Sequence, residues 1–263
     1  MEKKDKPSSL DKTYAVGISS RGIERIPYIQ DIVCAFENSV NKPQYIVVVD
    51  NNEVSVLEGK IKSDVPVHIV KSEYGKNVPS GSQTALDMFI NDNIDIAFKW
   101  DDSSVPQEGC IDRIFTLALE GYPAVGGVFP PHFEQRLCYY IDDKALFVPD
   151  YNVKHVQFFK WKEPVILDSS FLYSSFAYNI KKAQEIGGFF VNYSDASYRD
   201  ETDFTLRLSN GQNVLKIDTQ AVSTKYLVTE ESKEIVDEKR NLMLKVDDYI
   251  FNKRMKELGI EWK

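Results

Sequence analysis

The fold is decided by one stretch of the sequence, Phe98-Lys99-Trp100-Asp101-Asp102-Ser103-Ser104-Val105-Pro106, which places two adjacent carboxylates where a predicted strand ends. That strand covers 94–98 and is apolar and β-branched at alternate positions. A carboxylate pair at a strand end suits a hard divalent cation and, through it, a diphosphate. The alternative is that Asp101 and Asp102 open a turn and cap a helix that begins near Gln107.

Working outward from this stretch, apolar strands alternate with amphipathic helices. Strands are predicted at 13–18, 45–49, 67–70, 94–98 and 124–129, and apolar residues recur at helical spacing in 26–40, 85–90 and 111–118. Such alternation predicts an α/β fold with a mostly parallel central sheet flanked by helices. Ligands of such sheets bind beyond the carboxyl ends of the strands.

Polar residues follow the first two strands at these ends. Ser19 to Gly22 follow the first strand, and Asp50-Asn51-Asn52 follow the second. Asp50 is therefore expected to accept hydrogen bonds from a nucleoside base or ribose. A turn capped by Asp50 is the open alternative.

A second acidic cluster, Asp200-Glu201-Thr202-Asp203, is predicted to begin a helix, where carboxylates face the positive end of the helix dipole. It follows a short helix at 180–186 that Gly187-Gly188 is expected to stop. A last strand is predicted at 214–218, with a further segment at 221–226. The favourable position of carboxylates at a helix start is also a sufficient structural explanation of the cluster.

Two segments break the alternation. Residues 130–165 are rich in aromatic side chains, which either fill core or form a wall against a sugar or other acceptor. The tail from 230 to 263 is charged and helical in pattern. Its predicted apolar stripe consists of Ile235, Leu242, Leu244, Val246, Tyr249, Ile250 and Met255.

Composition limits the function classes. The 263 residues carry a formal net charge of −8, with a sequence pI of about 5.1, which argues against a nucleic-acid acceptor. A local basic groove is kept as an alternative. The cysteines Cys34, Cys110 and Cys138 lack the spacing of a zinc site. No signal peptide or membrane span is indicated, so a soluble cytoplasmic protein is expected.

Taken together, these elements resemble a family 2 glycosyltransferase with the nucleotide-diphospho-sugar transferase (GT-A) fold. Asp101-Asp102 and the following Val105-Pro106 resemble its metal motif, 14–25 its opening strand and turn, and 47–52 its Val-Val-Asp-Asp/Asn segment. Gly187-Gly188-Phe189 and 200–207 resemble its Gly-Gly-Phe and Glu-Asp-x-Asp-Leu-x-Leu-Arg stretches. The last of these carries the catalytic base.

This sequence departs from the family at three places. Gln83-Thr84-Ala85 replaces an Ala-Arg-Asn helix start, and the Glu-Asp pair is inverted to Asp200-Glu201. Lys225 stands where many members have a metal-ligating His, and an ammonium cannot ligate a cation. It could neutralise the leaving diphosphate instead.

The resemblance implies an inverting transfer of a sugar, from a donor that is expected to be UDP-linked, to a hydroxyl of a glycan, lipid-linked or other acceptor. Glu201 would be the base, with Asp200 beside it, and Asp102 with Asp101 would hold Mn²⁺ or Mg²⁺. Asp203 would brace the helix start or Arg207. The remaining donor contacts would come from Ser19, Arg21, Asp50, Asn52, Asn77, Asp101 and Lys225.

The expected organisation is a mobile leader (1–11), one GT-A domain (12–226) and a helical C-terminal extension (227–263). The domain divides into a nucleotide-sugar half (12–129) and an acceptor and catalytic half (130–226). Two other functions stay open: a nucleotidyltransferase of similar α/β plan, and a catalytically silent nucleotide-sugar binding module. The sequence does not name the donor sugar, the acceptor or the oligomeric state.

Overall fold

A computed structural model describes residues 12–128, 137–141, 144–148, 166–172, 174–197, 199–225 and 238–262. The predicted leader (1–11) and most of the aromatic segment 130–165 lie outside these residues, so the predictions made for them stay predictions.

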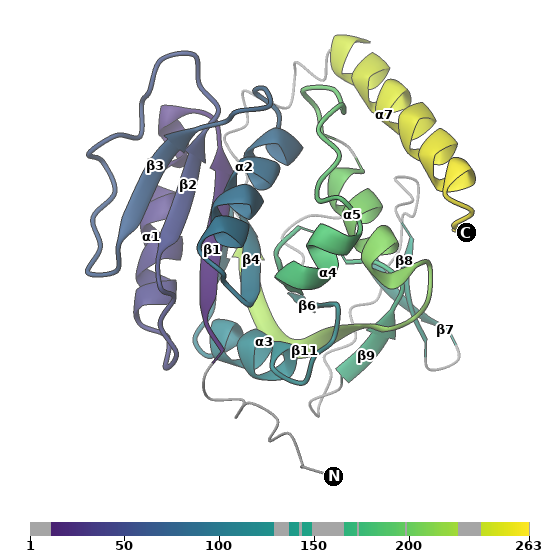
Figure 1. Cartoon of the computed structure of the whole chain (residues 1–263), viewed down its shortest axis with the longest axis horizontal. Helices are drawn as coiled ribbons and strands as arrows, with labels where there is room; N and C mark the ends of the chain where they lie inside the picture. The colour runs from purple at the N-terminus through teal and green to yellow at the C-terminus, as the bar shows by residue number, and fades with distance from the viewer. Residues whose placement is uncertain are drawn as a thin grey trace.

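Nine strands of the described chain form one sheet in the order β3-β2-β1-β4-β10-β6-β11-β5, with β9 also paired to β11 (Figure 1). Their bounds are β1 Tyr14–Ser20, β2 Ile46–Asp50, β3 Val67–Lys71, β4 Ile96–Asp101, β5 Ser104–Pro106, β6 Ala124–Val128, β9 Ile166–Ser169, β10 Phe176–Asn179 and β11 Leu215–Lys225. The first four strands are parallel, and β10 lies antiparallel between β4 and β6. Strands β7 (Leu137–Ile141) and β8 (Lys144–Val148) form a separate hairpin.

Helices cover both faces of the sheet. One face packs against α1 (Ile26–Glu37) and α3 (Cys110–Ala118), and the other against α2 (Val78–Asn91), α4 (Ile180–Glu185) and α5 (Asp200–Ser209). Alternation along the strands produces the two layers: Val16 and Ile18 of β1 join the first core, and Ala15 joins the second. The prediction of an α/β fold with a central sheet between helices is therefore confirmed.

Helix α2 approaches β1 closely because glycines stand at the contact. A Cβ atom on Gly17 would lie 2.9 Å from the Cβ of Ala85, and one on Gly81 would lie 2.4 Å from Ser19 Oγ. The first turn of α2 is thereby brought against the carboxyl end of β1.

Two predicted boundaries differ from the structure. The helix after the acidic pair begins at Cys110, not near Gln107, because Ser104–Pro106 form β5 and pair with β11. Pro106 is compatible with this because β5 is an edge strand. The segments predicted at 214–218 and 221–226 run as the single strand β11, whose pairing with β6 shifts register between Ile217 and Val222.

The C-terminal helix α7 (Glu238–Glu257) is present and runs beside α5 (Figure 1). Its predicted apolar stripe is correct in part: Met255 is buried and Ile250 packs against the same cluster, whereas Leu242, Val246 and Tyr249 are exposed and Ile235 lies outside the described residues. The helix also buries Asp247 and Phe251, which precede Met255 at four-residue spacing. Asp247 can be buried because Ser194 donates two hydrogen bonds to its carboxylate. Among the described helices, none combines the length and apolar character needed to cross a bilayer.

Candidate active site

The strand register brings the predicted site residues to one edge of the sheet. Ser19 of β1 lies opposite Asp101 of β4, and Ser20 of β1 lies opposite Asp50 of β2. Because these strands are parallel, their carboxyl ends meet at this edge, as the sequence predicted.

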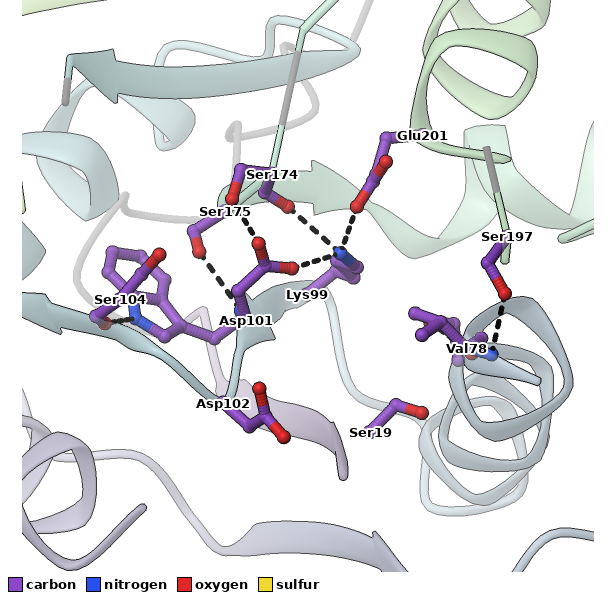
Figure 2. A network of polar contacts seen from close by, with 12 residues as sticks. Ser19, Val78, Lys99, Asp101, Asp102, Ser104, Ser174, Ser175, Ser197 and Glu201 are labelled. Atoms are coloured by element: carbon purple, nitrogen blue, oxygen red, sulfur yellow. Dashed lines mark hydrogen bonds and ion pairs between the residues drawn. The ribbon is translucent and has the colours of Figure 1, made fainter. Parts of the chain in front are cut away.

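The centre of the site is Lys99, a buried lysine on β4 (Figure 2). Its Nζ atom donates to Asp101 Oδ1 and to Glu201 Oε1, each at 2.6 Å, and to the carbonyl oxygen of Ser174 at 3.1 Å. Asp101 Oδ2 accepts a hydrogen bond from the Ser174 hydroxyl, and the Asp101 backbone N–H donates to Ser175 Oγ. The lysine thus joins Asp101 of β4 to Glu201 of α5.

The charge of Lys99 is maintained by these carboxylates. Burial alone would lower the pKa of this ammonium, but Asp101 and Glu201 raise it above its usual value. The lysine side chain is 3% exposed, so removing both carboxylates would leave a buried charge without compensation.

Asp102 points away from this cluster and lies in a second polar group (Figure 2). Its Oδ2 atom accepts a hydrogen bond from Ser20 Oγ at 2.7 Å, and its Oδ1 atom lies 3.5 Å from a terminal nitrogen of Arg25. The two adjacent aspartates are therefore held by different elements: Asp101 by β4 and the segment before β10, Asp102 by β1 and the 3-10 helix η2 (Ile23–Arg25).

The inverted acidic pair at the start of α5 divides into two environments. Glu201 reaches Lys99 and keeps 12% of its side chain exposed. Asp200 is 3% exposed, and burial together with the neighbouring Glu201 carboxylate raises its pKa well above the usual range. The structure therefore favours a neutral Asp200 beside an accessible Glu201. Asp203 accepts hydrogen bonds from Arg207, Arg254 and Tyr193, which confirms its predicted bracing role.

Asp50 is enclosed by its own loop. Its Oδ1 atom accepts hydrogen bonds from the backbone and side-chain nitrogens of Asn52, and its Oδ2 atom accepts from Ser55 Oγ and the N–H groups of Val56 and Leu57. Burial acts to raise the pKa of Asp50, but these hydrogen bonds lower it to about 2. The contacts are those of the turn-capping alternative; a nucleoside contact for Asp50 stays a prediction.

The other predicted donor contacts lie around this edge. Asn52 accepts from the Gly22 N–H, and Ser19 Oγ accepts from Asn51 Nδ2 at 2.7 Å. Arg21 is exposed on the loop after β1. Lys225 ends β11 opposite Ser104, two positions after Asp102.

Asn77 caps α2 by accepting from the Ser80 N–H, and its amide nitrogen donates to the carbonyl oxygens of Val191 and Tyr193. These contacts account for its side chain structurally. Its predicted role in donor binding is not tested by them.

A divalent cation would find limited protein ligation here. Within the described ranges, no three His, Cys, Asp or Glu side chains form a group that could hold a metal ion. Both Asp101 oxygens already bind Lys99 or Ser174, whereas Asp102 is bound through Ser20 and at longer range Arg25. One carboxylate completed by phosphate oxygens and water is a recognised mode of Mg²⁺ binding, so Asp102 fits that role.

The sequence analysis did not assign Lys99, Ser20, Arg25 or Ser174 to the site. A signal for Lys99 was present in the sequence: it is a lone cation among the apolar residues 96–100, two positions before the acidic pair. A lysine is fully buried only when it is paired. Nothing in the local sequence pointed to Ser174, which contacts Asp101 from 73 positions away.

In sequence, the chain matches no protein-family model and no curated protein. In structure, it is similar to the mannosyltransferase PcManGT from Pyrobaculum calidifontis in complex with GDP-Man and Mn²⁺, with a TM-score of 0.57 and 13% identity over 86% of this chain. It is similar to S. aureus TarS 1-349 with a TM-score of 0.53 and 11% identity over 81% of the chain. The complex of TarS 1-349 with UDP gives 0.53 and 12% over 84%.

The chain has a glycosyltransferase fold. It spans 60% of the length of PcManGT and of TarS 1-349, and 62% in the UDP complex. At this identity the likeness establishes the fold alone.

Proposed function

We propose that this chain is a family 2, GT-A glycosyltransferase that moves a sugar from a nucleotide-diphospho-sugar to an acceptor hydroxyl with inversion. The observation that carries the proposal is the meeting of Asp101 and Glu201 on one buried ammonium. This contact connects the predicted base, Glu201, with the carboxyl ends of the strands, where such folds bind ligands.

Glu201 is the general base of this proposal. It takes the proton of the acceptor hydroxyl while that oxygen attacks the anomeric carbon and the nucleoside diphosphate leaves. The environment supports this choice over Asp200, because a carboxyl group that favours its neutral form cannot accept a proton. Hydrogen bonding to Lys99 holds Glu201 in place.

The donor diphosphate is proposed to lie beside Asp102, near the ends of β1 and β11. Counted at formal charge, Asp101, Asp102 and Glu201 against the two cations Lys99 and Arg25 leave one net negative charge when Asp200 is neutral. A diphosphate would be repelled by that charge. Asp102 would hold Mn²⁺ or Mg²⁺, which supplies positive charge for the leaving group, and Lys225 is proposed to add to it.

The donor is proposed to be UDP-linked, with a GDP-linked donor as the specific alternative. Both nucleotides occur in similar structures, UDP with TarS and GDP-Man with PcManGT. The acceptor is proposed to be a glycan, a lipid-linked group or another hydroxyl.

The test is a thermal-shift screen of UDP- and GDP-sugars with and without Mn²⁺, followed by assays of sugar release and transfer. A bound donor raises the apparent stability by mass action. Stabilisation by a nucleotide-sugar, with sugar transferred in inverted configuration, supports the proposal. Binding without any turnover would identify a silent binding module. Formation of a nucleotide-sugar from a nucleoside triphosphate would identify a nucleotidyltransferase.

A further inference from the structure

The C-terminal helix α7 is attached to the segment that carries the candidate base. Phe251 and Met255 of α7 and Ile260 after it share a buried cluster with Leu206 of α5, and Arg254 Nε donates to Asp203 Oδ2 of α5 at 2.8 Å. Asp247 receives hydrogen bonds from the backbone and hydroxyl of Ser194 at 2.7 and 2.8 Å. The helix therefore packs against both α5 and the loop before it.

Arg199 makes the contact closest to the acidic pair. It directly precedes Asp200 and has a φ of 80°, in the left-handed region that a non-glycine residue adopts only when its surroundings hold it there. Its carbonyl oxygen accepts from the Asp203 N–H at 2.8 Å, the first hydrogen bond of α5. The conformation of Arg199 thus sets how the first turn of α5 begins.

The Arg199 side chain contacts three residues of the C-terminal segment. Its Nε atom donates to Asp248 Oδ1 at 2.8 Å, and its guanidinium carbon lies 5.0 Å from the Trp262 ring centroid and 5.7 Å from that of Phe251. The charge-assisted hydrogen bond fixes one edge of the guanidinium, and both rings lie within cation–π distance of it.

We propose that Arg199 is a positioning residue through which α7 sets the direction of Glu201, so that residues 238–262 belong to the catalytic unit instead of forming an appendage. The proposal rests on the proposed function, because it assigns α7 a part in the same reaction. Releasing Arg199 would let the first turn of α5 relax, and a small misplacement of a catalytic group can cost about 10²-fold in rate.

The experiment uses the full chain and the variant Asp248→Asn, which removes the carboxylate partner of Arg199 from a side chain that is 42% exposed. Donor turnover is measured with UDP-glucose and GDP-mannose and with water as the acceptor, so that no acceptor need be known. The control is Glu257→Gln, which removes the carboxylate that pairs with Lys253 on the same helix. Hydrogen–deuterium exchange of peptide 200–207 reports on α5 without any donor.

We expect Asp248→Asn to lower kcat by about tenfold while donor affinity and melting temperature stay near the wild type, and to speed exchange in 200–207 but not in α2. Arg199→Met should behave alike, Arg199→Lys should restore part of kcat, and Arg199→Met combined with Asp248→Asn should lose no more than either alone. Glu257→Gln should match the wild type.

If the wild type is active and Asp248→Asn changes neither kcat nor the exchange of 200–207, the proposal for α7 is overturned and the proposed function still stands. A joint fall in kcat, donor affinity and melting temperature would also overturn the proposal for α7, because that is the result of general destabilisation. If the wild type turns over neither these donors nor any nucleotide-sugar of the thermal-shift screen, the proposed function fails, and the positioning role fails with it.

Discussion

Lys99 Nζ of β4 lies 2.6 Å from Glu201 Oε1 of α5, although 102 positions separate the two residues in the sequence. The same nitrogen lies 2.6 Å from Asp101 Oδ1. The contact therefore ties the end of a central strand to the first turn of a helix from the other half of the chain. In the proposed enzyme, it sets the position of the base relative to the donor.

The first prediction concerns the stability of this ion-pair group. Lys99→Met leaves the partly buried Asp101 and Glu201 without their shared cation, so the free energy of unfolding should fall by about 3–5 kcal/mol, measured by urea denaturation. Adding Glu201→Gln should recover part of the loss, because one uncompensated charge is removed. Strict additivity of the two changes would show that the contact is not energetically coupled.

The second prediction separates the two members of the inverted pair. Glu201→Gln should lower the rate of transfer by at least about 10²-fold while nucleotide-sugar binding persists, because only the proton acceptor is lost. Asp200→Asn should be milder, since an amide resembles the neutral carboxyl group that burial favours. Steady-state kinetics and donor titrations measure both. If Asp200→Asn is inactive and Glu201→Gln is nearly normal, Asp200 is the base and Glu201 is not. If both variants are fully active, the base lies outside this acidic pair.

The third prediction concerns Asp50. Asp50→Ala should lower the free energy of unfolding by about 2 kcal/mol or more at pH 7, because the N–H groups of Val56 and Leu57 lose their acceptor. The pKa of Asp50 is lowered from 3.8 to about 2, so its stabilisation is present above about pH 4 and is lost as the pH falls toward 2. The difference in the free energy of unfolding between the wild type and Asp50→Ala should therefore become smaller as the pH falls over that range. Chemical denaturation at each pH measures it.

Exposed Glu53 of the same loop provides the control for this measurement, because Glu53→Ala removes a charge without removing a buried acceptor. Equal effects of the two variants would contradict the structural role of Asp50. If Asp50→Ala also weakens donor affinity at a temperature where the protein is folded, the predicted nucleoside contact gains support.

The fourth prediction addresses the metal. Asp102→Asn keeps the shape of the side chain and removes its charge, so transfer should need a higher Mn²⁺ concentration than in the wild type. Titrating Mn²⁺ at fixed donor concentration measures the shift. Activity that is unaffected at limiting Mn²⁺ would place the metal elsewhere or remove it from the reaction.

The order of strands and helices could be predicted from the sequence because alternation along a buried strand and helical spacing are local properties. Asp101-Asp102 and Asp200-Glu201 were found for the same reason, since each is a short motif beside an element boundary. The edge strand β5 was missed because Ser104-Val105-Pro106 has the composition of a turn and becomes a strand only by pairing with β11.

The local sequence determined the acidic motifs that are candidates for the chemistry, and the tertiary structure decided which side chains lie together with them. A pattern of residues does not reveal that Lys99 meets Glu201, or that α7 docks with a buried Asp247 that Ser194 satisfies. Each of these depends on contacts between distant segments, where burial makes an unpaired charge or N–H group costly, so the partners that satisfy it are chosen only when the chain has folded.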